Sequence, residues 1–297
     1  MGLTVRRNHN PKMGSILDTP QRTFWGQKSF VVITGASLGI GRGISIEFAK
    51  NVGPGSVFLI IARNQANLNE TKSLMEKVAP EVHVQTASLD LSNPNEGDFL
   101  KAIQSAATVN GNDSSAFQHA ILVHNAASIG DVKLLLSQYD NLEYLQKYYN
   151  LNMISTVLLN SFFLKVFHDS SKQRSIIQVT SLVSKVPVKT LGIYASAKAG
   201  RNVLMRVLAM EEKNLTTLSW APGVVSTDMY SECERSFDQD VVNFFLSMKE
   251  LGNLVTAEMS ASKLVKVLQD GSFENGSFVD YYELPEQYHP TLKDVVL

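Results

Sequence analysis

The stretch that decides the fold runs from Phe30 to Gly41 and reads FVVITGASLGIG. Its first residues are apolar and mostly β-branched, which favours a buried strand, and a helical pattern follows the stretch. Gly35, Gly39 and Gly41 allow a tight turn and a close approach of the backbone to a pyrophosphate. The helix beyond offers free N–H groups and the positive end of its dipole. The turn therefore predicts a dinucleotide site, with a tight turn that binds nothing as the alternative.

Outward from this turn, short β-rich runs alternate with longer helical patterns, as in βαβ units stacked on a parallel sheet. The expected strands are apolar on both faces, as buried parallel strands are, and span Phe30–Thr34, Val57–Ala62, Val82–Ser88, His119–His124, Ser175–Thr180, Thr217–Ala221 and Ser277–Asp280. The expected helices span Gly41–Asn51, Asn67–Val78, Glu96–Ala107, Leu142–Phe167, Tyr194–Glu212 and Thr256–Gln269. This order predicts an α/β fold with a single Rossmann-type, doubly wound, seven-stranded parallel sheet flanked by helices.

The pattern sets the limits of one domain, which we expect to span residues 29–285. Residues 1–28 are polar and show neither the hydrophobic period of a helix nor that of a strand, so we expect a flexible N-terminal extension. We also expect a C-terminal tail over residues 286–297. A segment of mixed polarity at 228–255 interrupts the alternation. Long insertions at the carboxyl edge of such sheets usually cover a ligand, so we expect this one to cover the substrate. The alternative is a surface excursion without function.

The composition is that of an ordinary globular protein, with 44% hydrophobic and 19% charged residues among 297. Lys and Arg number 27 against 28 Asp and Glu, and the resulting net charge of -1 argues against nucleic-acid or membrane partners. With one cysteine, Cys233, and no histidines at metal-ligand spacing, we expect no disulfide and no metal site. The N-terminus lacks the apolar run of a signal peptide, so we expect a cytoplasmic protein with a small-molecule partner.

The cofactor type is indicated by Arg63, which directly follows the second expected strand. In dinucleotide folds this position faces the adenosine ribose, where an acidic residue would accept a hydrogen bond from the 2′-hydroxyl of NAD. An arginine suits the 2′-phosphate of NADP instead. The sequence therefore favours NADP(H), with an exposed surface arginine as the alternative. Arg42 is a second candidate for the phosphate.

A catalytic constellation follows the fifth expected strand. Ser181 stands at the end of that strand, and Tyr194 and Lys198 lie four positions apart in the next helix, so the ammonium stacks beside the phenol. The pKa of a free tyrosine is about 10, too high for acid–base work near neutral pH, and an adjacent cation favours the phenolate. The Ser181 hydroxyl stands where it could hold a carbonyl oxygen. Together the three residues predict proton transfer at a carbonyl group.

In this order, the glycine turn, the serine and the Tyr-x-x-x-Lys motif make the chain resemble the short-chain dehydrogenase/reductase family from about Ser29 to Tyr282. The resemblance implies that Tyr194 donates a proton to the carbonyl oxygen, that Ser181 polarises this oxygen, and that Lys198 binds the nicotinamide ribose and lowers the pKa of the tyrosine. It also implies that Asn152 supports a water-linked proton relay. The cofactor contacts that it implies are Gly35, Ser37, Gly39, Ile40, Gly41, Arg63, Asn64, Asp90, Leu91, Asn125, Tyr194, Lys198, Val225, Thr227 and Met229.

The resemblance also implies a homodimer, because the equivalent helices of the family pair across a two-fold axis. Two expected helices have the broad apolar faces that such pairing needs. The residues of these faces are Leu158, Leu159, Phe162, Phe163 and Val166 in one helix and Val203, Leu204, Val207 and Leu208 in the other. Packing of these faces on the chain's own sheet is the alternative.

Within the family the chain is similar to the sepiapterin reductases, above all in the segment Gly276-Ser-Phe-Val-Asp280-Tyr-Tyr. This resemblance implies that Asp280 anchors a pterin ring, since a carboxylate can accept two N–H bonds from its 2-amino-pyrimidinone edge. A strand-terminal acid that caps a turn is the alternative. The implied substrate contacts are Ser181, Leu182, Tyr194, Gly223 and Asp280. Three positions depart from the pattern, since Leu38 replaces an arginine, Ala127 a glycine and Leu191 a tryptophan.

These features lead to one expected function and two rivals. We expect NADPH-dependent reduction of a pterin side-chain ketone, in sepiapterin or a 6-pyruvoyl pterin, within tetrahydrobiopterin synthesis. A general reductase of benzil-type diketones is the rival of the same class, and it has no use for the Asp280 carboxylate. A non-catalytic NADPH-binding sensor or scaffold is the rival of another class, and the intact Ser181, Tyr194 and Lys198 argue against it.

Overall fold

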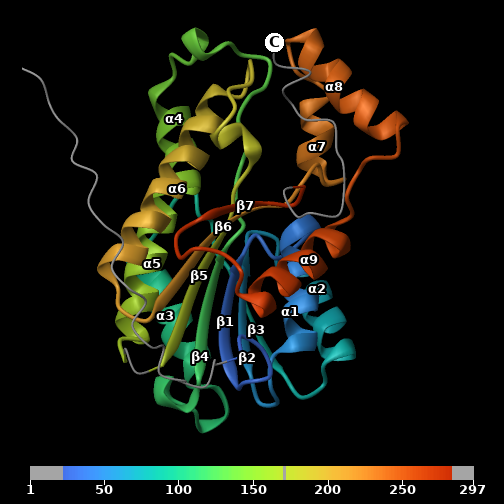
Figure 1. The fold of residues 1–297 in the computed structure, drawn as a ribbon. Helices are drawn as coiled ribbons and strands as arrows, with labels where there is room; N and C mark the ends of the chain where they lie inside the picture. The colour runs from blue at the N-terminus through green and yellow to red at the C-terminus, as the bar shows by residue number, and fades with distance from the viewer. Residues whose placement is uncertain (1–22, 170–171, 283–297) are drawn as a thin grey trace, which may run out of the picture.

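The computed structural model describes residues 23–169 and 172–282. Seven parallel strands form one sheet in the order β3-β2-β1-β4-β5-β6-β7 (Figure 1), which confirms the expected α/β fold. The strands are β1 Ser29–Thr34, β2 Val57–Ala62, β3 His83–Ser88, β4 His119–His124, β5 Gln173–Val179, β6 Leu215–Ala221 and β7 Phe278–Asp280. The strand order reverses between β1 and β4, and the carboxyl side of such a switch point is where doubly wound sheets bind ligands.

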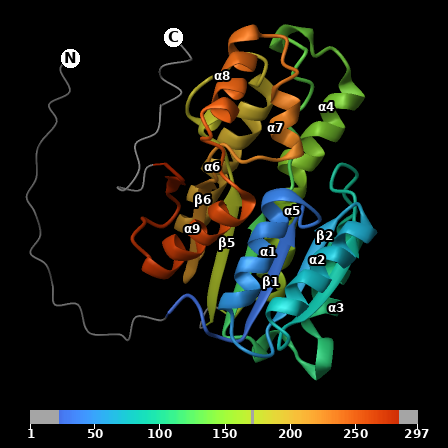
Figure 2. The ribbon, with the colours of Figure 1, turned by 90° about the vertical axis from the view of Figure 1, so that its right-hand side faces the viewer.

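Helices cover both faces of the sheet (Figure 1, Figure 2). The first core cluster joins α1, α2 and α9 to one face, and the second joins α3, α5 and α6 to the other. The helices are α1 Gly39–Asn51, α2 Gln65–Val78, α3 Glu96–Ala107, α4 Leu142–Tyr149, α5 Ser155–Val166, α6 Gly192–Glu211, α7 Asp228–Cys233, α8 Gln239–Glu250 and α9 Ala257–Asp270.

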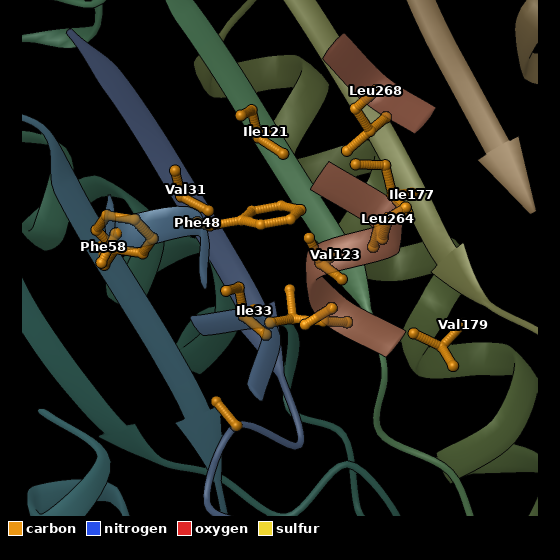
Figure 3. Packing of buried hydrophobic residues seen from close by; sticks show 14 of the residues in the cluster. Val31, Ile33, Phe48, Phe58, Ile121, Val123, Ile177, Val179, Leu264 and Leu268 are labelled. Atoms are coloured by element: carbon orange, nitrogen blue, oxygen red, sulfur yellow. The ribbon is translucent and has the colours of Figure 1, made fainter. Parts of the chain in front are cut away.

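The core explains why the strands are apolar on both faces. Val31 and Ile33 of β1 pack with Phe48 of α1 on one face, as Figure 3 shows, while Phe30 and Val32 point into the cluster on the other face. Every residue of β1 is buried. Because successive side chains of a strand alternate between faces, a sheet covered on both sides requires this continuous apolar run.

The N-terminal boundary differs from the expected one. Phe24 and Trp25, which the sequence assigns to a flexible extension, are buried against the first core cluster. The Trp25 indole N–H donates to the carbonyl of Val265 in α9 at 3.0 Å. Two aromatic residues supply enough apolar surface to hold this short segment on the domain, despite its polar neighbours. The remainder of the expected extension, residues 1–22, and the expected tail, 286–297, lie outside the described residues.

Two further elements differ from expectation. The single helix expected over Leu142–Phe167 is interrupted by a π-helical turn at Asn150–Ile154, between α4 and α5. Such turns are often found at functional sites, and the periodicity of the sequence does not reveal them. The insertion at 228–255 contains two helices, α7 and α8, and its α8 buries Val241, Phe244 and Met248 along one face. The other expected elements begin and end within two residues of the observed ones.

Candidate active site

A cavity of about 1620 Å³ lies beyond the carboxyl ends of the central strands. A pocket for one drug-sized molecule typically has about 300–1,000 Å³, so this one has room for a dinucleotide and a second ligand. Most of the residues that the sequence assigns to the site contribute to its lining: Gly35, Gly39, Ile40, Asn125, Ser181, Leu182, Tyr194, Lys198, Gly223, Val225, Thr227, Met229 and Asp280. The parallel fold therefore gathers residues from across the sequence around one space.

The glycine turn between β1 and α1 has the geometry of a phosphate cradle. Gly35 and Gly39 have φ values of 66° and 53°, a left-handed conformation that favours glycine. A Cβ atom at Gly41 would lie 2.2 Å from the carbonyl oxygen of Gly35, so only glycine fits there. Leu38, the N-cap residue of α1, makes no side-chain cap, which leaves the N–H groups of the first turn for a ligand. This turn fits a dinucleotide pyrophosphate.

The adenosine end of the cofactor site is more open. Arg63 follows β2 and is exposed, and Asn64 caps α2 by accepting a hydrogen bond from the N–H of Asn67 at 3.0 Å. Burial works to raise the pKa of Asp90, but hydrogen bonds from Ser92 and the charges of Arg63 and Lys147 outweigh it and lower that pKa. The cavity lining does not include six expected contacts, namely Ser37, Gly41, Arg63, Asn64, Asp90 and Leu91.

The second expected phosphate ligand is engaged elsewhere. The Nη2 atom of Arg42 lies 2.8 Å from a carboxylate oxygen of Glu70 and donates to the carbonyl of Ser37 at 2.7 Å. Its Nε donates to the Thr71 hydroxyl at 3.0 Å. This ion pair compensates the charge of Arg42, so Arg63 is the better of the two candidates for a 2′-phosphate.

The catalytic candidates meet where α6 packs on the end of β5. Tyr194 and Lys198 are 7% and 2% exposed, and the Lys198 Nζ lies 5.4 Å from the centre of the Tyr194 ring. The same Nζ donates to the carbonyl of Val179, the last residue of β5, at 2.6 Å. Ser181 follows β5 and lines the same cavity. The arrangement can hold a carbonyl oxygen between a hydroxyl group and a phenol.

Electrostatics in this buried corner favour the neutral phenol. Burial raises the pKa of Tyr194 above its usual range, and the charge of Arg201 and a hydrogen bond with Ser181 oppose that shift. Burial also lowers the pKa of Lys198 well below its usual value, because a dry interior disfavours the ammonium form. The proton on Tyr194 is therefore available for donation near neutral pH.

Asn152, an expected catalytic residue, and His124, at the end of β4, both have positioning rather than cavity-lining geometry. Asn152 lies in the π-helical turn, where its Oδ1 accepts from the N–H of Ser128 at 3.1 Å and its Nδ2 donates to the carbonyl of Tyr148 at 3.0 Å. His124 ends β4 and pairs through Nε2 with Asn160 Oδ1 at 2.7 Å. The pKa of His124 is lowered to about 3, mainly by burial. The imidazole is therefore neutral near pH 7, which suits a structural residue.

Asp280 ends β7 on the wall of the same cavity as Tyr194. It is 4% exposed, and its Oδ1 accepts a hydrogen bond from the N–H of Tyr282 at 2.8 Å. This bond agrees with the turn-capping alternative, while the place on the cavity wall agrees with ligand binding. A carboxylate has several acceptor sites, so both roles are compatible with one side chain.

The insertion supplies cavity residues that sequence reasoning missed. Side chains of α7 and α8 line the cavity opposite the sheet, including Tyr230, Cys233, Phe244, Phe245 and Met248. These helices lie beyond the carboxyl ends of the strands (Figure 1). Lys189 pairs with Asp238 at 3.1 Å, which links the loop before α6 to the start of α8. The i, i+3, i+7 spacing of the apolar residues in α8 is the signal that could have revealed this wall.

The three departures from the family pattern all lie on the cavity. Leu38 is 45% exposed at the glycine turn, Leu191 is buried at the entrance to α6, and Ala127 is half-buried after β4. Leu38 therefore places an aliphatic group at the cofactor cradle instead of a charged one, and Leu191 a smaller side chain than tryptophan on the wall.

Two negative findings concern the described residues only. No helix within 23–169 and 172–282 combines the length and the apolar character needed to cross a membrane. In the same part of the chain, no three His, Cys, Asp or Glu side chains come together as a possible metal site.

Comparison with known proteins agrees with this geometry. The family model described as short chain dehydrogenase matches residues 29–236. Sepiapterin reductase of Mus musculus is 33% identical over 255 residues, which cover 85% of this chain and 96% of the relative. Benzil reductase ((S)-benzoin forming) of Bacillus subtilis is 26% identical over 258 residues, which cover 85% and 98%.

A solved structure, that of the KRED1-Pglu enzyme, is 25% identical, with a TM-score of 0.69 over 84% of this chain and 100% of the other. The glycine turn, the order of the strands and the Ser181, Tyr194 and Lys198 cluster agree with the match over most of the domain. The chain belongs to the short-chain dehydrogenase/reductase family of oxidoreductases.

Proposed function

We propose that this enzyme uses NADPH to reduce a pterin side-chain ketone, such as that of sepiapterin or 6-pyruvoyl-tetrahydropterin, in cytoplasmic tetrahydrobiopterin biosynthesis. The observation that carries the proposal is Asp280, which lines the same cavity as Tyr194. A carboxylate on the wall of a largely apolar pocket gives a pterin ring, with its adjacent N–H donors, a specific partner. The sepiapterin reductases among the relatives support the same substrate class.

The proposed chemistry assigns one task to each side chain. When bound, NADPH supplies a hydride to the carbonyl carbon. Ser181 donates a hydrogen bond to the carbonyl oxygen, and Tyr194 donates its proton to that oxygen as negative charge develops there. Tyr194 is buried and Ser181 is half-buried, so little water competes for these hydrogen bonds. Asp280 holds the far end of the substrate and so orients the ketone toward Tyr194.

A general diketone reductase is a second candidate that specific observations favour. The cavity presents Leu136, Leu191, Val188, Phe244 and Met248 to a ligand, and these side chains suit aromatic rings without polar edges. Benzil reductases are among the relatives. The two candidates share the catalytic residues and differ in the use of Asp280.

The acid–base role predicts that Tyr194→Phe removes most turnover, by about 10²- to 10⁴-fold, because the proton donor is lost. Binding of NADPH, followed by its fluorescence, should be retained because the cofactor cradle is unchanged. Reduction of ketones by this variant at a near wild-type rate would contradict the assigned role. A wild-type protein that binds NADPH yet reduces no ketone would instead support a non-catalytic sensor.

The cofactor assignment predicts that Arg63→Asp weakens binding of NADPH far more than binding of NADH. A hydrogen bond to a charged group contributes about 1.5–3 kcal/mol, which corresponds to roughly tenfold or more in Kd. Lys77→Asp is a matched control, because it makes the same change of charge at an exposed position of α2. Equal losses for NADPH and NADH would show that Arg63 does not contact the 2′-phosphate.

The substrate assignment predicts that Asp280→Ala selectively reduces kcat/KM for sepiapterin. The variant would leave pterin donors unpaired in the complex, at a cost on the order of 10²-fold. Reduction of benzil by the same variant should change little, because benzil has no N–H groups. The measured quantity is the ratio of the two kcat/KM values. If both activities fall together, Asp280 has only the turn-capping role, and if neither falls, the pterin assignment fails.

We also propose that the chain forms a homodimer through α5 and α6. Of the expected apolar faces, Leu159 and Phe163 are buried in the core, whereas Val203 and Val207 are 57% and 39% exposed. Exposed apolar side chains grouped on one helix are typical of an interface. Val203→Arg should convert a dimer into a monomer in sedimentation at micromolar concentration, whereas Leu74→Arg, on the opposite face of the domain, should not. A monomeric wild-type protein would disprove the proposal.

A further inference from the structure

A third buried basic residue lies on the catalytic face of α6. Arg201 is fully buried, and it follows Tyr194 by seven positions and Lys198 by three, so all three side chains lie on one face of the helix. Its Nε donates to Gln178 Oε1 at 3.0 Å, and its Nη2 donates to the carbonyl of His124 at 3.0 Å. These bonds fix the guanidinium at the carboxyl ends of β4 and β5.

The hydrogen-bond partners of Arg201 are neutral acceptors. Gln178 is an amide, and His124 contributes a backbone carbonyl, so neither compensates the positive charge. The Nη1 atom is buried without a hydrogen-bond partner in the described residues. Burial of an arginine in this state is costly, and a fold that maintains it without function would gain more from an apolar residue. A negative charge that arises near Arg201 during the reaction would compensate its positive charge.

The phenol of Tyr194, on the same face of α6, is the group that acquires such a charge during the reaction. We propose that Arg201 is a positioning residue that stabilises the Tyr194 phenolate through its fixed positive charge, without touching the substrate. This inference rests on the acid–base role of Tyr194 and not on the identity of the ketone. Reduction leaves a phenolate behind when the proton moves to the carbonyl oxygen, and a cation in a dry interior stabilises that anion strongly.

Arg201 is better suited to this task than Lys198. Burial lowers the pKa of Lys198 well below its usual value, so the amine loses its charge readily. Burial also lowers the pKa of Arg201, to about 10, which still leaves the guanidinium charged at neutral pH. A persistent charge at this place favours the phenolate whatever the protonation state of the lysine.

Other ionisable groups surround Tyr194 and Arg201 and also influence the pKa of Tyr194. Tyr148 of α4 interacts electrostatically with both Tyr194 and Arg201, and burial keeps its own phenol neutral. Cys233 of α7 acts on Tyr194 in the opposite direction, and burial raises the pKa of its thiol to about 12. His124 is neutral, so Arg201 is the main source of positive charge among these neighbours.

The test is the pH dependence of alcohol oxidation, with benzoin and NADP⁺ as the probes. Benzoin gives its hydroxyl proton to the Tyr194 phenolate and a hydride to NADP⁺, so the rate rises with pH as the phenol ionises. Arg201→Met should move this rising limb to higher pH by about one unit or more, because an adjacent cation typically lowers a pKa by 1–3 units. Arg201→Lys, which keeps a basic group at this position, should move the limb less than Arg201→Met does. Benzoin does not require Asp280, so failure of the pterin assignment leaves this test intact.

A second variant keeps the arginine in place and guards against misfolding of the first. Gln178→Glu puts a carboxylate at the Nε of Arg201 with almost the same shape as the amide, and it should move the limb in the same direction. Arg174→Met is the matched control. Arg174 is also buried but pairs with Glu212 at 3.3 Å, near the amino end of β5, so its loss should leave the limb unmoved.

The outcomes separate an electrostatic role from a structural one. Affinity for NADPH, measured by fluorescence, should be similar in wild type, Gln178→Glu and Arg201→Lys. A lower rate with an unmoved limb in both Arg201→Met and Gln178→Glu would overturn the proposal and leave Arg201 a packing residue. A wild-type enzyme that oxidises benzoin without a rising limb would also overturn it, because Tyr194 would then have no acid–base role in that reaction.

Discussion

The burial of one face of α6 against the carboxyl ends of β4 and β5 is the constraint on which the site depends. Three side chains of that face, Tyr194, Lys198 and Arg201, bond to or lie near strand ends that the parallel sheet fixes in place. The close packing excludes water. This raises the pKa of the Tyr194 phenol and strengthens the electrostatic interactions between nearby charged groups. The fold thus determines both the position and the acidity of the catalytic candidate.

The same constraint explains how the second half of the cavity is built. The strand ends form one wall of the cavity. The insertion with α7 and α8 forms the opposite wall, and its apolar residues lie opposite the catalytic face of α6. The pair formed by Lys189 and Asp238 ties this insertion to the loop that precedes α6. The catalytic wall follows the family pattern, whereas the opposite wall is supplied by the insertion.

Much of this arrangement could be predicted from the sequence because it rests on local signals. The glycine turn, the apolar strands and the four-residue spacing of Tyr194 and Lys198 each reflect backbone geometry that a short stretch determines. The fold and the residues near the strand ends that line the cavity follow from them, whereas the lining residues of α8 do not.

Other features could not be predicted, because they arise from packing between distant segments. The π-helical turn at Asn152, the burial of Trp25 against α9, and the engagement of Arg42 by Glu70 depend on contacts that sequence periodicity does not encode. Arg201 appears in the sequence as an ordinary helix residue. Its significance emerges only when its burial and its uncharged partners are known.

The central claim, that this enzyme reduces a pterin side-chain ketone, is tested most directly by isotope transfer. The protein would be incubated with sepiapterin and NADPH that carries deuterium at both C4 positions, and the product examined by mass spectrometry and NMR. We predict a product with one deuterium, located on the side-chain carbinol carbon. If benzil gains deuterium under the same conditions while sepiapterin does not, the enzyme is a diketone reductase and the pterin claim is wrong. If neither gains deuterium, the reductase chemistry itself is contradicted.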